Sequence, residues 1–292
     1  MKYQIKHVTT YQYSDKVTLS QNHARLIPQT NENQRCLNYR IEISPSADYT
    51  AEYNDYFSNQ VTIFEVPTLH DEMVVTAISE VEITYRQPQA LFLQQLTWES
   101  VRDQLRSPQN QQQILATEFS IPSLHTEYND EIKNYALQSF TPDRAIVEAC
   151  LDLMSRIFNE FQFDPNFTTI STPVADIFKH KRGVCQDFSH FALACIRSVG
   201  LAARYVSGYI ETIPPEGQIK LAGADATHAW FSVYVPGTGW LEFDPTNNIQ
   251  PSDQHVTLAS GRDFADITPL KGVMFGGGSH QLKVEVDMNR IN

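Results

Sequence analysis

The first third of the chain alternates between apolar and polar side chains, and this pattern limits that part of the molecule to β-structure. On the first expected strand the residues of one face are Tyr3, Ile5, His7, Thr9, Tyr11 and Tyr13. Further strands are expected at about 18–27, 37–43, 61–66 and 73–85, with turn residues between them. The pattern predicts an all-β, sandwich-like N-terminal domain over residues 1–86.

The remaining two thirds change from helical to strand patterns. A segment rich in Gln and Pro, 87–129, is expected to connect two domains and to hold one short helix near 98–105. Helices follow at about 130–140 and 142–161, the second with Thr141 as N-cap and Pro142 in its first turn. Strands are expected at 203–211, 229–235, 240–243 and 282–288. Helices followed by strands predict an α+β domain over 130–292.

Composition excludes several classes of function. The 292 residues carry a formal charge of −12 and lack the basic patch that a phosphate backbone requires, so no nucleic-acid partner is expected. No apolar run suits a bilayer or a signal peptide, which indicates no membrane partner and a cytoplasmic location. The four cysteines form no paired framework, and neither CxxC nor HExxH is present, so no metal or cofactor is expected.

Cys185 stands out among the cysteines because a helical pattern begins there. Gly183 interrupts the chain just before it, and Gly200 ends the helix. The apolar stripe of this helix contains Val184, Phe188, Phe191, Ala192, Cys195 and Val199. In the first turn, free backbone N–H groups and the helix dipole favour a thiolate. A free cysteine is more often a buried small hydrophobe, and that is the interpretation for the other three.

His228 and Asp244 could complete a catalytic site with Cys185. His228 begins one expected strand and Asp244 ends the next, so the three offer a nucleophile, a base and an orienting carboxylate. A five-residue loop, 234–238, would put His228 opposite Asp244, whereas a four-residue loop, 236–239, would put them on opposite faces. The sequence therefore predicts the longer loop or a bulge. Asp225 and Asp187 compete for the orienting role, although Asp187 is better suited to support the helix N-terminus.

Four ordered blocks resemble the core of the bacterial transglutaminase-like superfamily, whose members are described as candidate cysteine proteases. The blocks are Gly183–Val184–Cys185–Gln186–Asp187–Phe188, Ala203 to Tyr209, His228–Ala229–Trp230, and Gly239 to Thr246. The stretch 55–59 is similar to a motif of the family's N-terminal β domain, except that Ser58 replaces a glycine. The stretch 262–272 resembles the family's C-terminal block.

The resemblance implies a papain-like, transglutaminase-like α+β core with Cys185 as nucleophile, His228 as general base and acid, and Asp244 as the orienting carboxylate. It implies a cysteine peptidase or amidase that acts on a peptide or protein substrate. A protein-glutamine transamidase and a catalytically silent polypeptide-binding protein are the alternatives. An oxyanion hole needs the Cys185 N–H and a second donor, for which Gln162 is a candidate. Substrate identity and oligomeric state stay open.

Overall fold

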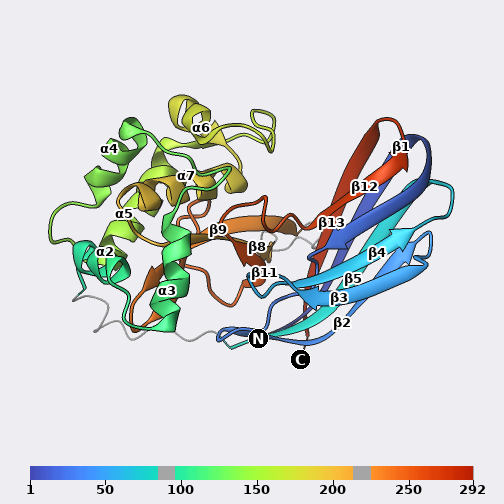
Figure 1. The fold of residues 1–292 in the computed structure, drawn as a ribbon, viewed down its shortest axis with the longest axis horizontal. Coiled ribbons are helices and arrows are strands. Elements are labelled where there is room, and N and C mark those ends of the chain that lie inside the picture. Colours follow the sequence, from blue (N-terminus) through green and yellow to red (C-terminus); the bar gives the residue numbers. More distant parts are fainter. Residues whose placement is uncertain (85–95, 213–224, 292) are drawn as a thin grey trace, which may run out of the picture.

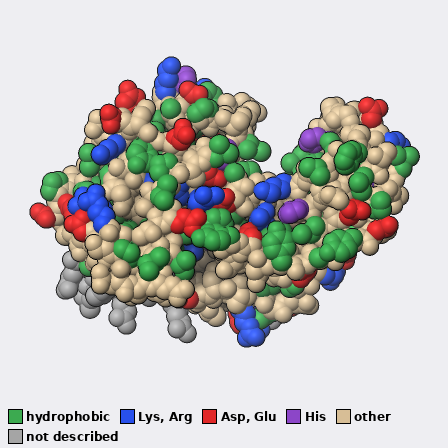
Figure 2. All heavy atoms as spheres, viewed as in Figure 1, with side chains coloured by type: hydrophobic (Ala, Val, Ile, Leu, Met, Phe, Trp, Pro, Cys, Tyr) green, Lys and Arg blue, Asp and Glu red, His purple; other side chains and the backbone are tan. Residues whose placement is uncertain are grey.

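The computed structural model describes residues 1–84, 96–212 and 225–291, and these form two lobes side by side, one of β-strands and one mixed (Figure 1). The surface is hollowed between the lobes, and on the face shown in Figure 2 acidic and basic side chains are interspersed. Among the described residues, no helix has both the length and the apolar character needed to cross a membrane.

The β lobe is one antiparallel sheet in the order β2-β5-β1-β4-β3, with β12 and β13 also paired to β1. Its strands are β1 (Lys2–Ala24), β2 (Gln34–Ser44), β3 (Tyr49–Asn54), β4 (Gln60–Val66), β5 (His70–Ile83), β12 (Leu270–Gly276) and β13 (His280–Ile291). The face of β1 that the sequence predicts to be buried is buried from Tyr3 to Thr9.

The long strand β1 belongs to both halves of this sheet. Its first half, Lys2 to Gln12, pairs with β5 and β13, and its second half pairs with β4 and β12. Phe64 and Val66 of β4 share one apolar cluster with Met73 and Val75 of β5. The sheet thus folds over its own core, which confirms the sandwich-like domain that the alternation predicts.

The two C-terminal strands lie in the β lobe and not in the lobe to which the sequence analysis assigned them. Lys2 pairs with Ile291, and Ala24 pairs with Leu270. The two ends of the chain are therefore neighbours, as Figure 1 shows. A strand pattern reveals which side chains are buried but not which sheet the strand joins, so the expected domain 130–292 includes strands that pair elsewhere.

The mixed lobe packs helices against a four-stranded sheet in the order β10-β9-β8-β11. Its helices are α2 (Trp98–Arg106), α3 (Gln111–Thr117), a 3-10 turn (Glu118–Ser120), α4 (Asp130–Ser139), α5 (Ile146–Glu160), α6 (Val174–His180) and α7 (Cys185–Ser198). Its strands are β8 (Ala203–Ile210), β9 (Ala226–Val235), β10 (Gly239–Phe243) and β11 (His255–Gly261), with the short parallel pair β6 (Gln162–Phe163) and β7 (Arg182–Gly183). Helix α7 is buried from Asp187 to its end, so it forms the centre of this lobe.

Several expected boundaries change. The predicted helix near 98–105 is confirmed as α2, and its Trp98, Val101 and Leu105 enter the core. Helix α5 begins at Ile146, not at Pro142, because Arg144 N–H closes a turn on the Thr141 carbonyl and Asp143 has a φ of 59°. The polar tract Asn110–Gln113 caps and begins α3, a helix that the sequence analysis did not predict. Residues 85–95 of the expected connecting segment lie outside the described residues.

Candidate active site

Cys185 is the first residue of α7, and the residues around it explain why the helix begins there. The Asp187 carboxylate accepts the Val184 N–H at 2.8 Å and the Thr168 hydroxyl at 2.7 Å, so it caps the helix. Only glycine fits at position 183, because a Cβ there would lie 2.7 Å from the Asp187 carboxylate oxygen. The expected supporting role of Asp187 is confirmed, and Cys185 is partly exposed at the positive end of the helix.

His228 and Asp244 lie on the same face of the β9–β10 hairpin. Gly239 pairs with Val235, so the connection is three residues long, 236–238. The prediction of a longer loop is wrong. A three-residue loop, like a five-residue loop, keeps His228 and Asp244 on the same face of the hairpin. Continuing the strand pairing by one residue puts Asp244 opposite Trp230, and His228 is two residues from Trp230 and so on the same face. The predicted same-face arrangement is confirmed.

His228 and Asp244 form a hydrogen-bonded pair, and Cys185 lies close enough to His228 to influence its pKa. His228 Nε2 lies 2.8 Å from Asp244 Oδ2, and Cys185 is among the groups that raise the pKa of His228. Because Nε2 faces the carboxylate, Nδ1 is the ring nitrogen left for the thiol. Only 7% of His228 and 0% of Asp244 is exposed, so water does not compete for this pair.

Asp244 is held as a carboxylate by five donors. Oδ1 accepts the backbone N–H of Thr246 at 3.0 Å and of Asn247 at 3.3 Å. Oδ2 accepts the Asn247 amide at 2.7 Å and faces His228 and His255. Burial alone raises the pKa of a carboxyl, but these hydrogen bonds, led by those of the two histidines, hold the pKa of Asp244 well below its usual range.

The same contacts favour a charged His228. Burial lowers the pKa of this imidazole, but the hydrogen bonds to Asp244 and Cys185 and the negative charges of both outweigh burial and raise the pKa to about 10. An imidazolium is therefore expected beside Cys185 at neutral pH. A cation in this position stabilises a thiolate.

The competing residues have other partners. Asp225 accepts the backbone N–H of Thr212 at 2.7 Å and of Met288, so it links β13 to the mixed lobe. His190, a second histidine close to Cys185 in the sequence and also in α7, accepts the Phe264 N–H at 3.2 Å and is buried. Cys195 is buried in the core, as is Cys150, which confirms their expected packing role, whereas Cys36 is only half-buried.

The sequence analysis missed His255 and Asn247. Asn247 follows the end of β10 in an irregular turn, and His255 begins β11, a strand that the sequence analysis did not predict. His255 Nε2 lies 3.2 Å from Asp244 Oδ2. The sequence signal for this residue is weak: a histidine stands directly before the alternating residues Val256, Thr257 and Leu258.

One group of described residues has the donor set of a metal site. His228, Asp244 and His255 each offer one ligand atom, and these three atoms lie within 4.8 Å of one another. Two imidazoles and one carboxylate are a ligand set that suits a transition metal. Hydrogen bonds from both rings to the shared carboxylate account for this proximity. We therefore assign no metal to them.

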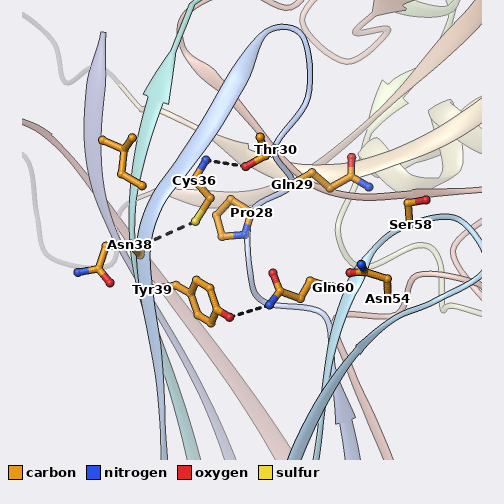
Figure 3. Close-up of a pocket in the computed structure, with 10 residues that line it drawn as sticks. Pro28, Gln29, Thr30, Cys36, Asn38, Tyr39, Asn54, Ser58 and Gln60 are labelled. Atoms are coloured by element: carbon orange, nitrogen blue, oxygen red, sulfur yellow. Dashed lines mark hydrogen bonds between the residues drawn. The ribbon is translucent and has the colours of Figure 1, made fainter.

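A pocket of about 410 Å³ lies away from Cys185, in the β lobe. Figure 3 shows its lining, which is mostly amides and hydroxyls such as Gln29, Asn38 and Tyr39, together with Cys36. The Cys36 thiol donates to the Asn38 carbonyl. Among the described residues that line this pocket there is no imidazole or carboxylate, so they supply no base for nucleophilic catalysis.

Two family models match this chain, one over strands of the β lobe and one over most of the mixed lobe. Residues 3–82 match the bacterial transglutaminase-like N-terminal region, and residues 133–245 match the transglutaminase-like superfamily. The second match includes Cys185, His228 and Asp244 and ends just after Asp244.

Individual relatives cover from three quarters to all of the chain. The uncharacterized protein Rv2569c of Mycobacterium tuberculosis is 37% identical over 98% of this chain and 92% of its own length. A protein-glutamine gamma-glutamyltransferase of Pseudomonas aeruginosa is 25% identical over 75% of this chain but only 34% of its own length. A crystal structure of a candidate cysteine protease from Cytophaga hutchinsonii has the same fold, with a TM-score of 0.78 at 20% identity over 100% of this chain and 92% of that one.

Proposed function

Because the chain belongs to the transglutaminase-like superfamily, we propose that it is a thiol-dependent acyl-transfer enzyme, a cysteine peptidase or amidase that uses Cys185, His228 and Asp244. One observation carries this proposal: His228 hydrogen-bonds through Nε2 to the buried Asp244 carboxylate at 2.8 Å, and Cys185, at the start of α7, is close enough to raise the pKa of His228. A nucleophile, a base and an orienting group in this order are what covalent acyl transfer requires.

Acylation begins at the sulfur. The Cys185 thiolate attacks the carbonyl carbon of an amide, and the imidazolium of His228 gives its proton to the leaving amine as the C–N bond breaks. The backbone N–H of Cys185, in the first turn of α7, is one donor for the oxyanion. Gln162 is our candidate for the second donor, because β6 pairs with β7 directly before Cys185.

Deacylation needs an acceptor. His228, now neutral, takes a proton from water, and the hydroxide attacks the thioester carbonyl. The acid leaves, Cys185 is regenerated as a thiolate, and His228 again carries the proton. The sum is amide plus water giving acid plus amine, which is hydrolysis.

The second candidate is transamidation, favoured by the likeness to the Pseudomonas glutamyltransferase. The same thioester would then be attacked by a primary amine instead of water. Incubation with a glutamine peptide and a labelled amine separates the two. Hydrolysis predicts release of the free acid with little label incorporated, and efficient incorporation would overturn the choice of a hydrolase.

The direct test is a matched pair of cysteine variants assayed on a peptide library by mass spectrometry. Cys185→Ala should abolish product formation while the protein still unfolds cooperatively, since the side chain is small and partly exposed. Cys36→Ala, at the other free cysteine that is not fully buried, should keep wild-type activity. Equal activity in the Cys185 variant would end the proposal.

A silent polypeptide-binding protein is the alternative from another class. Peptides that bind the wild-type protein and leave unchanged, without a covalent intermediate on Cys185, would favour it. The expected cytoplasmic location is part of the proposal, and cell fractionation with an antibody to the chain tests it.

A further inference from the structure

A second histidine contacts the carboxylate of the proposed site. His255 begins β11, only 5% of it is exposed, and its Nε2 lies 3.2 Å from the Asp244 oxygen that faces His228. The His255 ring packs edge-on against Trp230 at 5.3 Å between centroids and lies 6.1 Å from the His228 ring. The ring is therefore fixed by packing on one side and by the carboxylate on the other.

The proton on His255 can be assigned from its neighbours. The Ser252 backbone N–H points at Nδ1 at 3.5 Å, so Nδ1 is the acceptor and Nε2 carries the hydrogen in the neutral ring. Nε2 then donates to Asp244 Oδ2, the same oxygen that accepts from His228. The position of this oxygen is thus determined by two imidazole donors at once.

Two amide side chains of the β lobe hydrogen-bond to the backbone of the edge strand β11 and so hold His255 in place. The Gln34 amide donates to the Thr257 carbonyl at 2.7 Å, and its oxygen accepts the Thr257 N–H at 2.8 Å. The Asn59 amide makes the same pair of bonds to Ser260, at 3.0 and 2.8 Å. We call Gln34 and Asn59 the amide clamp. It fixes β11 two and five residues after His255.

The space behind His255 is small. A cavity of about 20 Å³, lined by His255, Ser252 and Glu242 of the mixed lobe and by Gln34 of the β lobe, holds at most one water. The ring therefore has little room to leave Asp244. The titratable groups that contact His255 or line the same cavity are Asp244, His228 and Glu242, and Asp253 lies two residues before it in the chain.

We propose that His255 is a positioning residue, which aims the Asp244 carboxylate at His228 and so sets the balance between thiol and thiolate at Cys185. The inference rests on the proposed function, because it needs Cys185 and His228 to act as a pair. His255 itself touches no reacting atom. Its loss removes one of the two imidazole donors to Oδ2, so this oxygen is less firmly directed at His228 and the imidazolium is then less well stabilised.

The test is the pH dependence of Cys185 alkylation by iodoacetamide, read by peptide mapping in the wild type and three variants. His255→Leu keeps the volume but removes the donor, and it should slow alkylation at pH 6 about tenfold and move the midpoint to higher pH. His255→Gln keeps a donor near the position of Nε2 and should stay within about threefold of wild type. His70→Leu, at another buried histidine but in the β lobe, should match wild type.

Two outcomes overturn the inference while the proposed function stands. The first is that folded His255→Leu shows the wild-type pH dependence of Cys185 alkylation. The second is that His255→Gln is as impaired as His255→Leu, which would mean that the packing of the ring matters and its hydrogen bond does not. Slow alkylation of Cys185 in the wild type would instead contradict the proposed function. Nitrogen-15 NMR of the wild type then tests the role of His255 independently, because it shows which ring nitrogen carries the hydrogen. We expect the hydrogen on Nε2, and a hydrogen on Nδ1 alone would overturn the inference.

Discussion

At the scale of residues, the site depends on a carboxylate that is fully buried and still charged. Such a group is costly unless hydrogen bonds replace its water, and Asp244 has five donors. The sequence predicts Cys185, His228 and Asp244 because each stands at the end of a regular element. It does not predict Asn247 and His255, because the turn and strand that bring them to Asp244 have no recognisable period.

The charge on His228 makes stability depend on pH. Its pKa is raised from 6.5 to about 10, so the charged ring stabilises the fold fully below pH 6.5, and this contribution is lost as the pH rises toward 10. His228→Gln should therefore cost more stability at pH 6 than at pH 9, by more than about 1 kcal/mol. Urea unfolding of both proteins at the two pH values measures the difference, and an equal cost at both would contradict a charged His228.

At the scale of elements, the start of α7 positions the nucleophile. The pattern after Gly183 predicts this helix, and the reason for the glycine becomes clear only in three dimensions, where Asp187 fills the space beside it. The β9–β10 hairpin is similar. The alternation of side chains along the two strands predicts that His228 and Asp244 share a face. The length of the loop depends on the conformation of the turn, in which Gly237 and Gly239 have φ values of 81° and 97°.

Loss of the α7 cap should be measurable in both stability and reactivity. Asp187→Ala removes the acceptor of the Val184 N–H, so we expect a loss of about 1–2 kcal/mol in the free energy of unfolding and slower alkylation of Cys185. Glu131→Ala, at an exposed acid in the first turn of α4, is the control and should change stability by less than about 0.5 kcal/mol. Equal effects of the two variants would show that the cap is unimportant.

At the scale of the molecule, the β lobe belongs to the architecture of the site. Asp55 accepts the backbone N–H of Phe57 and of Asn59, and the resulting turn presents the Asn59 amide to β11. Ser58 in this turn has a φ of 65°, which explains why glycine is the family's residue there. The sequence marks this motif, but not its partner, because the contact joins residues about 200 positions apart.

The amide clamp should couple the stability of the two lobes. Gln34→Leu leaves the buried N–H of Thr257 without its partner, while the Thr257 carbonyl keeps only the Gln29 N–H. We expect a loss of about 1–3 kcal/mol in the free energy of unfolding together with slower alkylation of Cys185. Gln21→Leu, at an exposed glutamine on β1, is the matched control and should be nearly neutral. If unfolding in urea and alkylation are the same in both variants, the clamp does not support the site.

The central claim is that Cys185 is a nucleophile activated by His228, and the chain contains its own reference thiol, Cys36. The most direct measurement is a short pulse of iodoacetamide at pH 6, followed by peptide mapping of both cysteines in the wild type and in His228→Gln. At this pH an ordinary thiol is almost entirely protonated. We predict that Cys185 reacts at least about tenfold faster than Cys36 and that His228→Gln removes the difference. Equal rates in the wild type would contradict the account.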